Sequence, residues 1–168
     1  GKRVMALESY VGLVEAGVGL IPAGGGCKEF AVRAADWAAQ SATPGEVFNF
    51  LQPVFQTIAM AKVGTSAAEL GPMGLLRQGD TITLGADQLI HDAKLRVLAL
   101  AANYRPSQPA TDLKAPGRSV AASLDSQLWN MRMGGFITEY EEQLGKTIAG
   151  VITGGDVPAG TVVTEQWF

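Results

Sequence analysis

The chain has 168 residues, a length typical of one domain, and its hydrophobic fraction of 47% is enough to fill one core. Thirteen basic and sixteen acidic residues leave a net charge of −3 without a run of like charges, so no nucleic-acid partner is expected. No apolar stretch reaches the ~20 residues of a membrane span, and a lone Cys27 with a lone His91 suits a reducing cytoplasm and excludes a zinc site.

The first predicted element is a buried strand in residues 9–21, a segment rich in β-branched residues and glycine. A glycine-rich turn over 22–26 ends it, and helical spacing of apolar residues predicts a helix over 28–41. The free N–H groups at the start of that helix form a potential anion site. Glu15 is a carboxylate inside the apolar strand, so it has to be paired, neutral or placed at a site that uses it.

Capping signals and periodicity predict the middle elements. The sequence Thr-Pro-Gly-Glu at 43–46 is typical of a helix start and predicts a helix over 43–64. A capping box at Ser66 predicts a short helix, and a strand follows over 81–84. Residues 86–102 form an amphipathic pattern whose buried stripe is expected to contain Ile90, Ala93, Val97, Leu100 and Ala101.

The C-terminal part is predicted to be a helical hairpin after a proline-rich linker over 103–116. Its helices cover 118–133 and 138–153, and a further short helix is expected over 161–168. The inward side chains of the hairpin are expected to be Val120, Leu124, Leu128, Met131, Tyr140, Leu144, Ile148 and Val151. The fold class is therefore α+β and predominantly α-helical, with five to six helices and one or two short strands.

Three residue patterns leave alternatives open or are excluded. Gly17 and Gly19 do not continue into a dinucleotide motif because Pro22 stands at the third glycine position, so no nicotinamide site is expected in this chain. Cys27 is either a reactive thiol at a helix start or a small packing residue. Glu15 is either functional or a carboxylate that reaches solvent at the end of a strand.

Residues 14–26, Val-Glu-Ala-Gly-Val-Gly-Leu-Ile-Pro-Ala-Gly-Gly-Gly, resemble the crotonase (enoyl-CoA hydratase/isomerase) superfamily, in which a glutamate precedes by seven residues a proline that opens a glycine-rich turn. The likeness covers about the first hundred residues. The extra helix over 43–63 and the tail over 117–168 look like the C-terminal hydratase part of bifunctional fatty-acid-oxidation proteins that also carry a 3-hydroxyacyl-CoA dehydrogenase. The chain is thus expected to be a C-terminal portion of a crotonase-like fold.

The resemblance implies hydration of trans-2-enoyl-CoA by the parent enzyme, with Glu15 transferring the proton at the substrate carbon. As a weaker expectation, the substrate would bind at Pro22, Gly24, Gly25 and Gly26. The other glutamate and the oxyanion amides would lie upstream of this chain, so the fragment alone is expected to be inactive. The fragment would need no cofactor, since NAD would bind in the separate dehydrogenase domain and coenzyme A would arrive with the substrate.

The resemblance also implies three segments: a hydratase core over 1–102, the linker over 103–116, and a helical extension over 117–168. Apolar surface exposed at the N-terminal strand would favour a homo-oligomer. The alternative function is a non-catalytic helical module for packing or interaction, in which Trp37, Trp129, Trp167, Phe50 and Phe55 serve core and interface.

Overall fold

The computed structural model describes residues 2–41 and 46–168. The chain divides into two compact units, which we call the α/β unit (residues 1–12 and 63–108) and the helical unit (residues 13–62 and 109–168). Each unit contains two separate stretches of the chain. Residues 13–62 therefore group with the C-terminal helices, whereas the expectation from sequence places them in one segment with the rest of 1–102.

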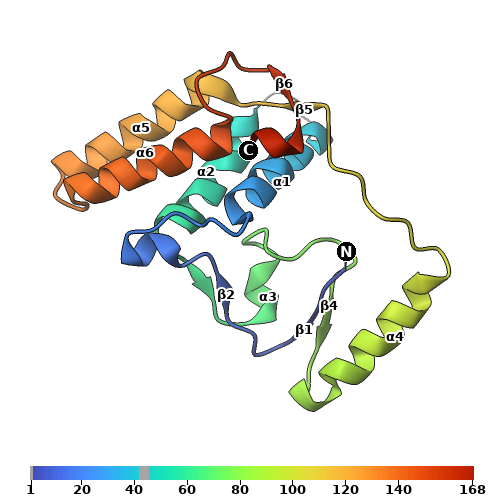
Figure 1. Ribbon diagram of the computed structural model, residues 1–168. Helices are drawn as coiled ribbons and strands as arrows, with labels where there is room; N and C mark the ends of the chain where they lie inside the picture. Colours follow the sequence, from blue (N-terminus) through green and yellow to red (C-terminus); the bar gives the residue numbers. More distant parts are fainter. Residues whose placement is uncertain (1, 42–45) are drawn as a thin grey trace. The chain divides into compact units, whose positions relative to one another are not determined.

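The α/β unit contains two small sheets and few helices. Strand β1 (Val4–Ala6) pairs in parallel with β4 (Thr81–Thr83), and β2 (Val11–Gly12) pairs antiparallel with β3 (Val63–Gly64) (Figure 1). The helices are α3 (Ala67–Leu70), the 3₁₀ helix η2 (Ala86–Gln88) and α4 (Leu89–Ala101). The hydroxyl of Thr83 donates to Asp92 at 2.7 Å and so connects β4 to α4.

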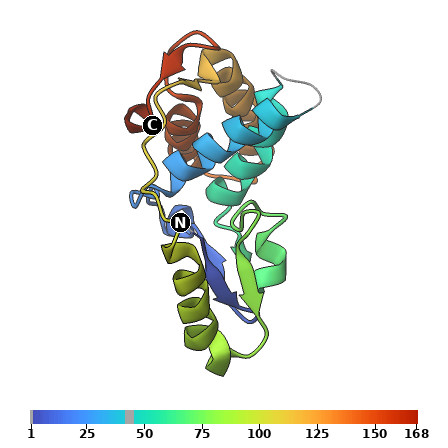
Figure 2. The ribbon, with the colours of Figure 1, turned by 90° about the vertical axis from the view of Figure 1, so that its right-hand side faces the viewer.

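Four helices build the helical unit: α1 (Gly26–Gln40), α2 (Val47–Ala59), α5 (Gly117–Met133) and α6 (Glu139–Thr153). Helix α6 packs against the other three (Figure 2). Shorter elements complete the unit, namely η1 (Glu15–Val18), the antiparallel pair β5 (Leu113–Lys114) and β6 (Val162–Val163), and η3 (Glu165–Trp167). The side chains of Leu51, Ile58, Leu124, Ile148 and Ile152 are fully buried and form its core.

The close approach of α5 and α6 depends on a residue without a side chain. A Cβ atom at Gly145 would lie 2.7 Å from a methyl carbon of Leu128, so any residue other than glycine would force Leu128 to shift. At the amino end of α6, Glu141 N–H donates to the Thr138 hydroxyl at 3.2 Å and Thr138 N–H donates to the Glu141 carboxylate at 2.7 Å. The predicted capping box is therefore confirmed.

The predominantly helical α+β class is confirmed, with six α-helices among the described residues, and the predicted helices over 28–41, 118–133 and 138–153 correspond to α1, α5 and α6. The described part of the chain contains six short strands rather than one or two. The expected helix start at Thr43 and Pro44 lies outside the described residues, and α2 is described from Val47.

Two predicted elements take another form. Only Val11 and Gly12 of the expected strand over 9–21 are in a strand, and the chain then turns into η1, which begins with Glu15. The glycines of this segment lower its preference for a continuous strand. The expected helix over 161–168 is instead the strand β6 followed by the single turn η3.

The predicted burial of α4 is wrong. None of its residues is buried, and the side chains of Ile90 and Val97 are 79% and 65% exposed. An amphipathic pattern shows which face of a helix can pack, but another surface has to cover that face. Tyr140, also predicted to be inside, is 59% exposed, although its hydroxyl donates to the Gly19 carbonyl at 2.7 Å.

Candidate functional site

The segment that carries Glu15 is positioned by its contacts with α1 and α6. Gly26, the first residue of α1, lies against Leu13, because a Cβ atom there would be 2.7 Å from the Leu13 methyl carbons. Gly25 precedes the helix with a φ of +88°, a conformation that glycine adopts without strain. On the other side of η1, Gly19 accepts the hydrogen bond from Tyr140 of α6. Both ends of the segment are thus held within the helical unit.

Glu15 and Cys27 are close enough to interact electrostatically. Burial, and secondly the charge of Glu15, raise the pKa of the Cys27 thiol to about 11. Cys27 is 3% exposed and forms no disulfide, so at neutral pH it is a buried, protonated thiol. These properties favour the packing role of Cys27 over the reactive one, because the thiolate is the nucleophile.

One oxygen of the Glu15 carboxylate is in unusual surroundings. Its Oε2 is buried and accepts no hydrogen bond from the residues that the structure describes. A buried carboxylate oxygen without a partner is uncommon, because its desolvation is not compensated. Glu15 is therefore the strongest candidate for a functional carboxylate in this chain.

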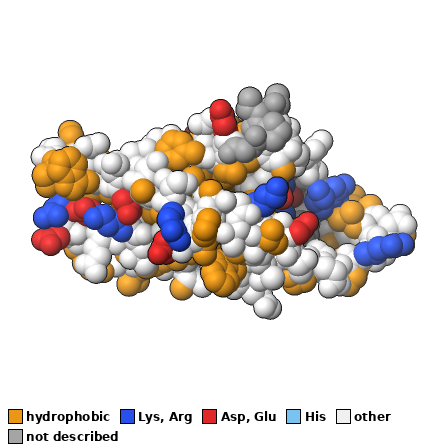
Figure 3. Space-filling model, turned by 90° about the horizontal axis from the view of Figure 1, so that it is seen from above, with side chains coloured by type: hydrophobic (Ala, Val, Ile, Leu, Met, Phe, Trp, Pro, Cys, Tyr) orange, Lys and Arg blue, Asp and Glu red, His pale blue; other side chains and the backbone are white. Residues whose placement is uncertain are grey.

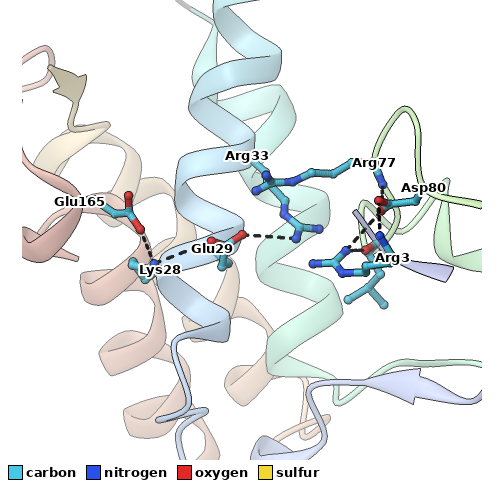
Figure 4. A network of polar contacts seen from close by, with 8 residues as sticks. Arg3, Lys28, Glu29, Arg33, Arg77, Asp80 and Glu165 are labelled. Carbon is cyan, nitrogen blue, oxygen red and sulfur yellow. Dashed lines mark hydrogen bonds and ion pairs between the residues drawn. The ribbon is translucent and has the colours of Figure 1, made fainter. Parts of the chain in front are cut away.

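Lys28, the cation that follows Cys27 in the sequence, is already paired. Lys28, in the first turn of α1, forms an ion pair with Glu165 of η3 and lies 3.7 Å from the Glu29 carboxylate (Figure 4). The hydrogen bond with Glu165 is the main cause that raises the pKa of Lys28. Glu165 also accepts from Ala110 N–H at 3.1 Å, so the three groups fasten η3 to α1.

A separate polar cluster lies in the α/β unit. Both carboxylate oxygens of Asp80 accept backbone hydrogen bonds, from Arg3 N–H at 2.9 Å and from Arg77 N–H at 2.8 Å (Figure 4). The pKa of Asp80 is lowered, because these bonds and the nearby cations outweigh the opposing effect of burial. The two backbone donors to this carboxylate are Arg3, next to β1, and Arg77, in the loop before β4. The cluster therefore fixes β1 to that loop.

The other residues predicted to bind substrate lead into α1. Pro22 is buried, Gly24 is exposed, and Gly25 and Gly26 form the turn into the helix. A side chain at Gly24 would meet no atom within 4 Å, so packing does not explain that glycine. Their role in substrate binding stays a prediction.

A cavity of about 460 Å³ lies in the helical unit, beside η1. Its volume is within the ~300–1,000 Å³ typical of small-molecule sites. It is lined by Ala16, Gly17, Phe55, Gln56, Ala59, Met60, Gln127, Leu128, Met131, Phe136, Ile137, Glu141, Leu144, Gly145 and Ile148. Most of these side chains are apolar, and the wall begins directly after Glu15.

Sequence reasoning missed this cavity, because its lining comes from four elements far apart in the chain. One signal was available, namely the apolar Phe136 and Ile137 in the turn between α5 and α6, where polar residues are usual. Phe136 is 80% exposed, and hydrophobic side chains gather at the end of the α5–α6 hairpin, on the left in Figure 3.

Among the described residues, the turn before α1 differs from the common dinucleotide-binding motif. The glycine-rich turn before α1 follows η1 and a loop, whereas the dinucleotide motif joins a parallel strand directly to its helix. Across the described residues no three His, Cys, Asp or Glu side chains gather as metal ligands would. No helix described is long and apolar enough to span a membrane.

One comparison with known proteins gives a match. The chain is 39% identical over 165 residues to a protein of Bacillus subtilis (strain 168) described as "Probable 3-hydroxyacyl-CoA dehydrogenase". The aligned part is 97% of this chain and 20% of the relative, so the chain spans about one fifth of the relative's length. No protein-family model and no solved structure matches the chain.

This similarity corrects the expectation of a crotonase-type hydratase. Residues 14–26, which carried the resemblance, belong to a chain aligned almost throughout with a protein described as a dehydrogenase. The resemblance rested on the spacing of one glutamate, one proline and several glycines, on the order of elements over the first hundred residues, and on the extra helix and the tail. A short spacing of this kind can occur in any loop that leads into a helix. Neither the crotonase assignment nor enoyl-CoA hydration is supported, and Glu15 opens a 3₁₀ helix rather than lying inside a strand.

Proposed function

We propose that this chain is part of an enzyme that oxidises 3-hydroxyacyl-CoA esters in fatty-acid metabolism, and that it contributes to substrate binding. The observation that carries the proposal is the 39% identity over nearly the whole chain. The helical unit supports it, because it contains both a largely apolar cavity and a carboxylate with an unpartnered oxygen.

The nicotinamide cofactor would bind to another part of such an enzyme. Dinucleotide sites of the common type lie at the edge of a parallel sheet of several strands. Here the only parallel pairing among the described residues joins the three-residue strands β1 and β4. The chain would therefore act together with a nicotinamide-binding region supplied by the remaining length of an enzyme like the relative.

Glu15 is the residue that we propose exchanges a proton with the substrate. Oxidation of a secondary alcohol removes a hydride from the carbon and a proton from the oxygen, and that proton needs an acceptor. The buried Oε2 of Glu15 has no hydrogen-bond donor among the described residues, so we propose that it accepts one from the substrate hydroxyl once binding has opened access to it. In the chain Glu15 directly precedes Ala16, the first residue of the cavity wall, without itself lining the cavity.

Replacement of the matching segment in the Bacillus subtilis relative tests the proposal. One variant carries this chain in place of the aligned fifth, and a second lacks that fifth. We expect the first variant to reduce NAD⁺ with a 3-hydroxyacyl-CoA and the second to lose this reaction while circular dichroism shows that its remainder is folded. Full activity in the folded deletion variant would refute the proposal.

A second candidate function, a contact module, is favoured by α4. Its exposed apolar side chains include Ile90, Leu95, Val97 and Leu98, each more than half exposed. Faces of this kind mark surfaces that bind protein. We propose that this face contacts a second copy of the chain in the cytoplasm. Analytical ultracentrifugation of a variant with Val97→Asp and Leu98→Asp should then show a smaller species than the wild type. Equal masses of the two proteins would exclude the contact.

A further inference from the structure

We propose that residues 14–20 form a lid that opens to give access to the buried Oε2 of Glu15, and that Tyr140 is the latch of this lid. The lid contains η1, the residue before it and the two residues after it. Its relevance to catalysis rests on the proposed function, which gives Glu15 its substrate. The lid and its latch follow from contacts within the helical unit.

The chain is fixed on both sides of the lid. Before it, Leu13 packs against Gly26 at the start of α1, where a Cβ atom would lie 2.7 Å from the Leu13 methyl carbons. After it, Pro22 is buried. A short loop whose two ends stay in place can move outward and return while the helices that carry it keep their positions.

The lid itself has few contacts with its surroundings. Ala16 is the only buried residue of η1, whereas the side chains of Val18 and Leu20 are 76% and 61% exposed. The backbone hydrogen bond from Leu20 N–H to the Glu15 carbonyl, at 3.0 Å, joins two residues of the lid to each other and not to a helix. Segments with few buried apolar contacts are those that open at the lowest free energy in a folded protein.

The closed position of the lid leaves Glu15 with an uncompensated cost. Its Oε2 is buried and accepts no hydrogen bond from the residues that the structure describes. Water supplies such hydrogen bonds when the lid is open, so opening restores the solvation that closure removes. This gain offsets part of the packing that is lost when Ala16 leaves its buried position.

Tyr140 fastens the lid to α6. Its hydroxyl donates to the Gly19 carbonyl at 2.7 Å, and a carbon of its ring lies 3.1 Å from the position of a Cβ atom at Gly19. Gly19 has a φ of +79°, which glycine adopts without strain. The contact is at the surface, because Tyr140 is 59% exposed, so water can take the place of the hydroxyl when the lid moves.

A second contact meets the middle of the lid. A Cβ atom at Gly17 would lie 3.2 Å from the methyl group of Ala61, which follows the carboxyl end of α2. Ala61 has a φ of +48°, the only positive value at a described residue other than glycine, and this conformation is strained for alanine. Alanine here supplies the methyl group that packs against the closed lid, which glycine would not.

The thiol of Cys27 reports the opening, because it is buried at the start of α1 and close enough to Glu15 to sense its charge. The measurement is the rate at which dithiobis(nitrobenzoate) labels the 168-residue chain. We expect this rate to stay constant at low urea concentrations, because opening of a short lid exposes little surface. Tyr140→Phe should raise the rate about fivefold, the effect of one lost hydrogen bond. Tyr104→Phe, at an exposed tyrosine of the α/β unit, is the control and should leave it unchanged.

Ala61→Gly separates opening of the lid from the stability of the whole chain. Glycine adopts the positive φ without strain, so the midpoint of urea unfolding should not fall, whereas loss of the methyl group should raise the labelling rate. A rate that increases with urea in parallel with global unfolding, or that is unchanged in Tyr140→Phe or in Ala61→Gly, would overturn the inference. The segment replacement tests the proposed function separately, since it measures oxidation and not the reactivity of a thiol.

Discussion

At the scale of single residues, Glu15 shows what the sequence can and cannot reveal. A carboxylate among glycines and apolar residues is recognisable as unusual from the sequence alone, and the structure adds that its Oε2 is buried without a partner among the described residues. The sequence could not show that Glu15 begins a 3₁₀ helix or approaches Cys27, because those properties depend on α1 and α6. Its catalytic role stays a prediction.

Glu15→Gln in the segment-replacement enzyme should lower the rate of NAD⁺ reduction by a factor of ~10²–10⁴, the usual contribution of a proton-transferring group. Glutamine keeps the size of the side chain and removes its basicity. Glu8→Gln changes an exposed glutamate of the α/β unit and should leave the rate unchanged. Steady-state kinetics with unchanged turnover in Glu15→Gln would exclude proton transfer by this residue.

The raised pKa of Cys27 predicts a loss of stability at alkaline pH. The folded chain keeps the thiol proton up to a pKa of about 11, whereas the unfolded chain loses it near 9.0. The stabilisation is thus fully present below pH 9 and is lost as the pH rises toward 11. In urea unfolding, the difference in the free energy of unfolding between the wild type and Cys27→Ala should shrink across this pH range. A difference that stays constant would contradict the raised pKa of Cys27.

At the scale of elements, the amino end of α6 was predictable, whereas Ser66, predicted to open a capping box, makes no side-chain capping bond before α3. The capping box of α6 uses only residues three positions apart, so local sequence determines it. The α4 helix was also located correctly, but its apolar stripe is exposed because burial requires a second surface. The cavity was missed for the same reason, since its four walls come from different parts of the chain.

Thr138→Ala should lower the free energy of unfolding of the helical unit by ~1 kcal/mol, the typical cost of losing an N-cap side chain. Tryptophan fluorescence reports on this unit, because Trp37, Trp129 and Trp167 all belong to it. Thr147→Ala removes an exposed hydroxyl in the middle of α6 and serves as the matched control, with an effect between zero and a slight stabilisation from helix propensity. Equal effects of the two variants would contradict the capping role.

Two glycines of α6 should respond differently to alanine. Gly150→Ala places a methyl group where no atom lies within 4 Å, so we expect stabilisation by ~0.5–1 kcal/mol from helix propensity. Gly145→Ala meets Leu128 at 2.7 Å and should be less stable than Gly150→Ala in the same urea unfolding experiment. The reverse order would contradict the close packing of α5 on α6.

At the scale of the whole molecule, the division into units was not predictable from the order of elements. The α/β unit and the helical unit each combine two separate stretches of the chain, and such pairing depends on contacts distant in sequence. The helical class, by contrast, followed from periodicity and composition alone. The proposed part in an enzyme also rests on information beyond local motifs, since the similarity to a protein described as a dehydrogenase extends over 165 residues.

The rate of NAD⁺ reduction by the Bacillus subtilis relative carrying this chain in place of its aligned fifth tests the central claim most directly. We expect a rate with 3-hydroxyacyl-CoA comparable to that of the unmodified relative, because the two segments are 39% identical. A folded replacement enzyme as inactive as the deletion variant would contradict it.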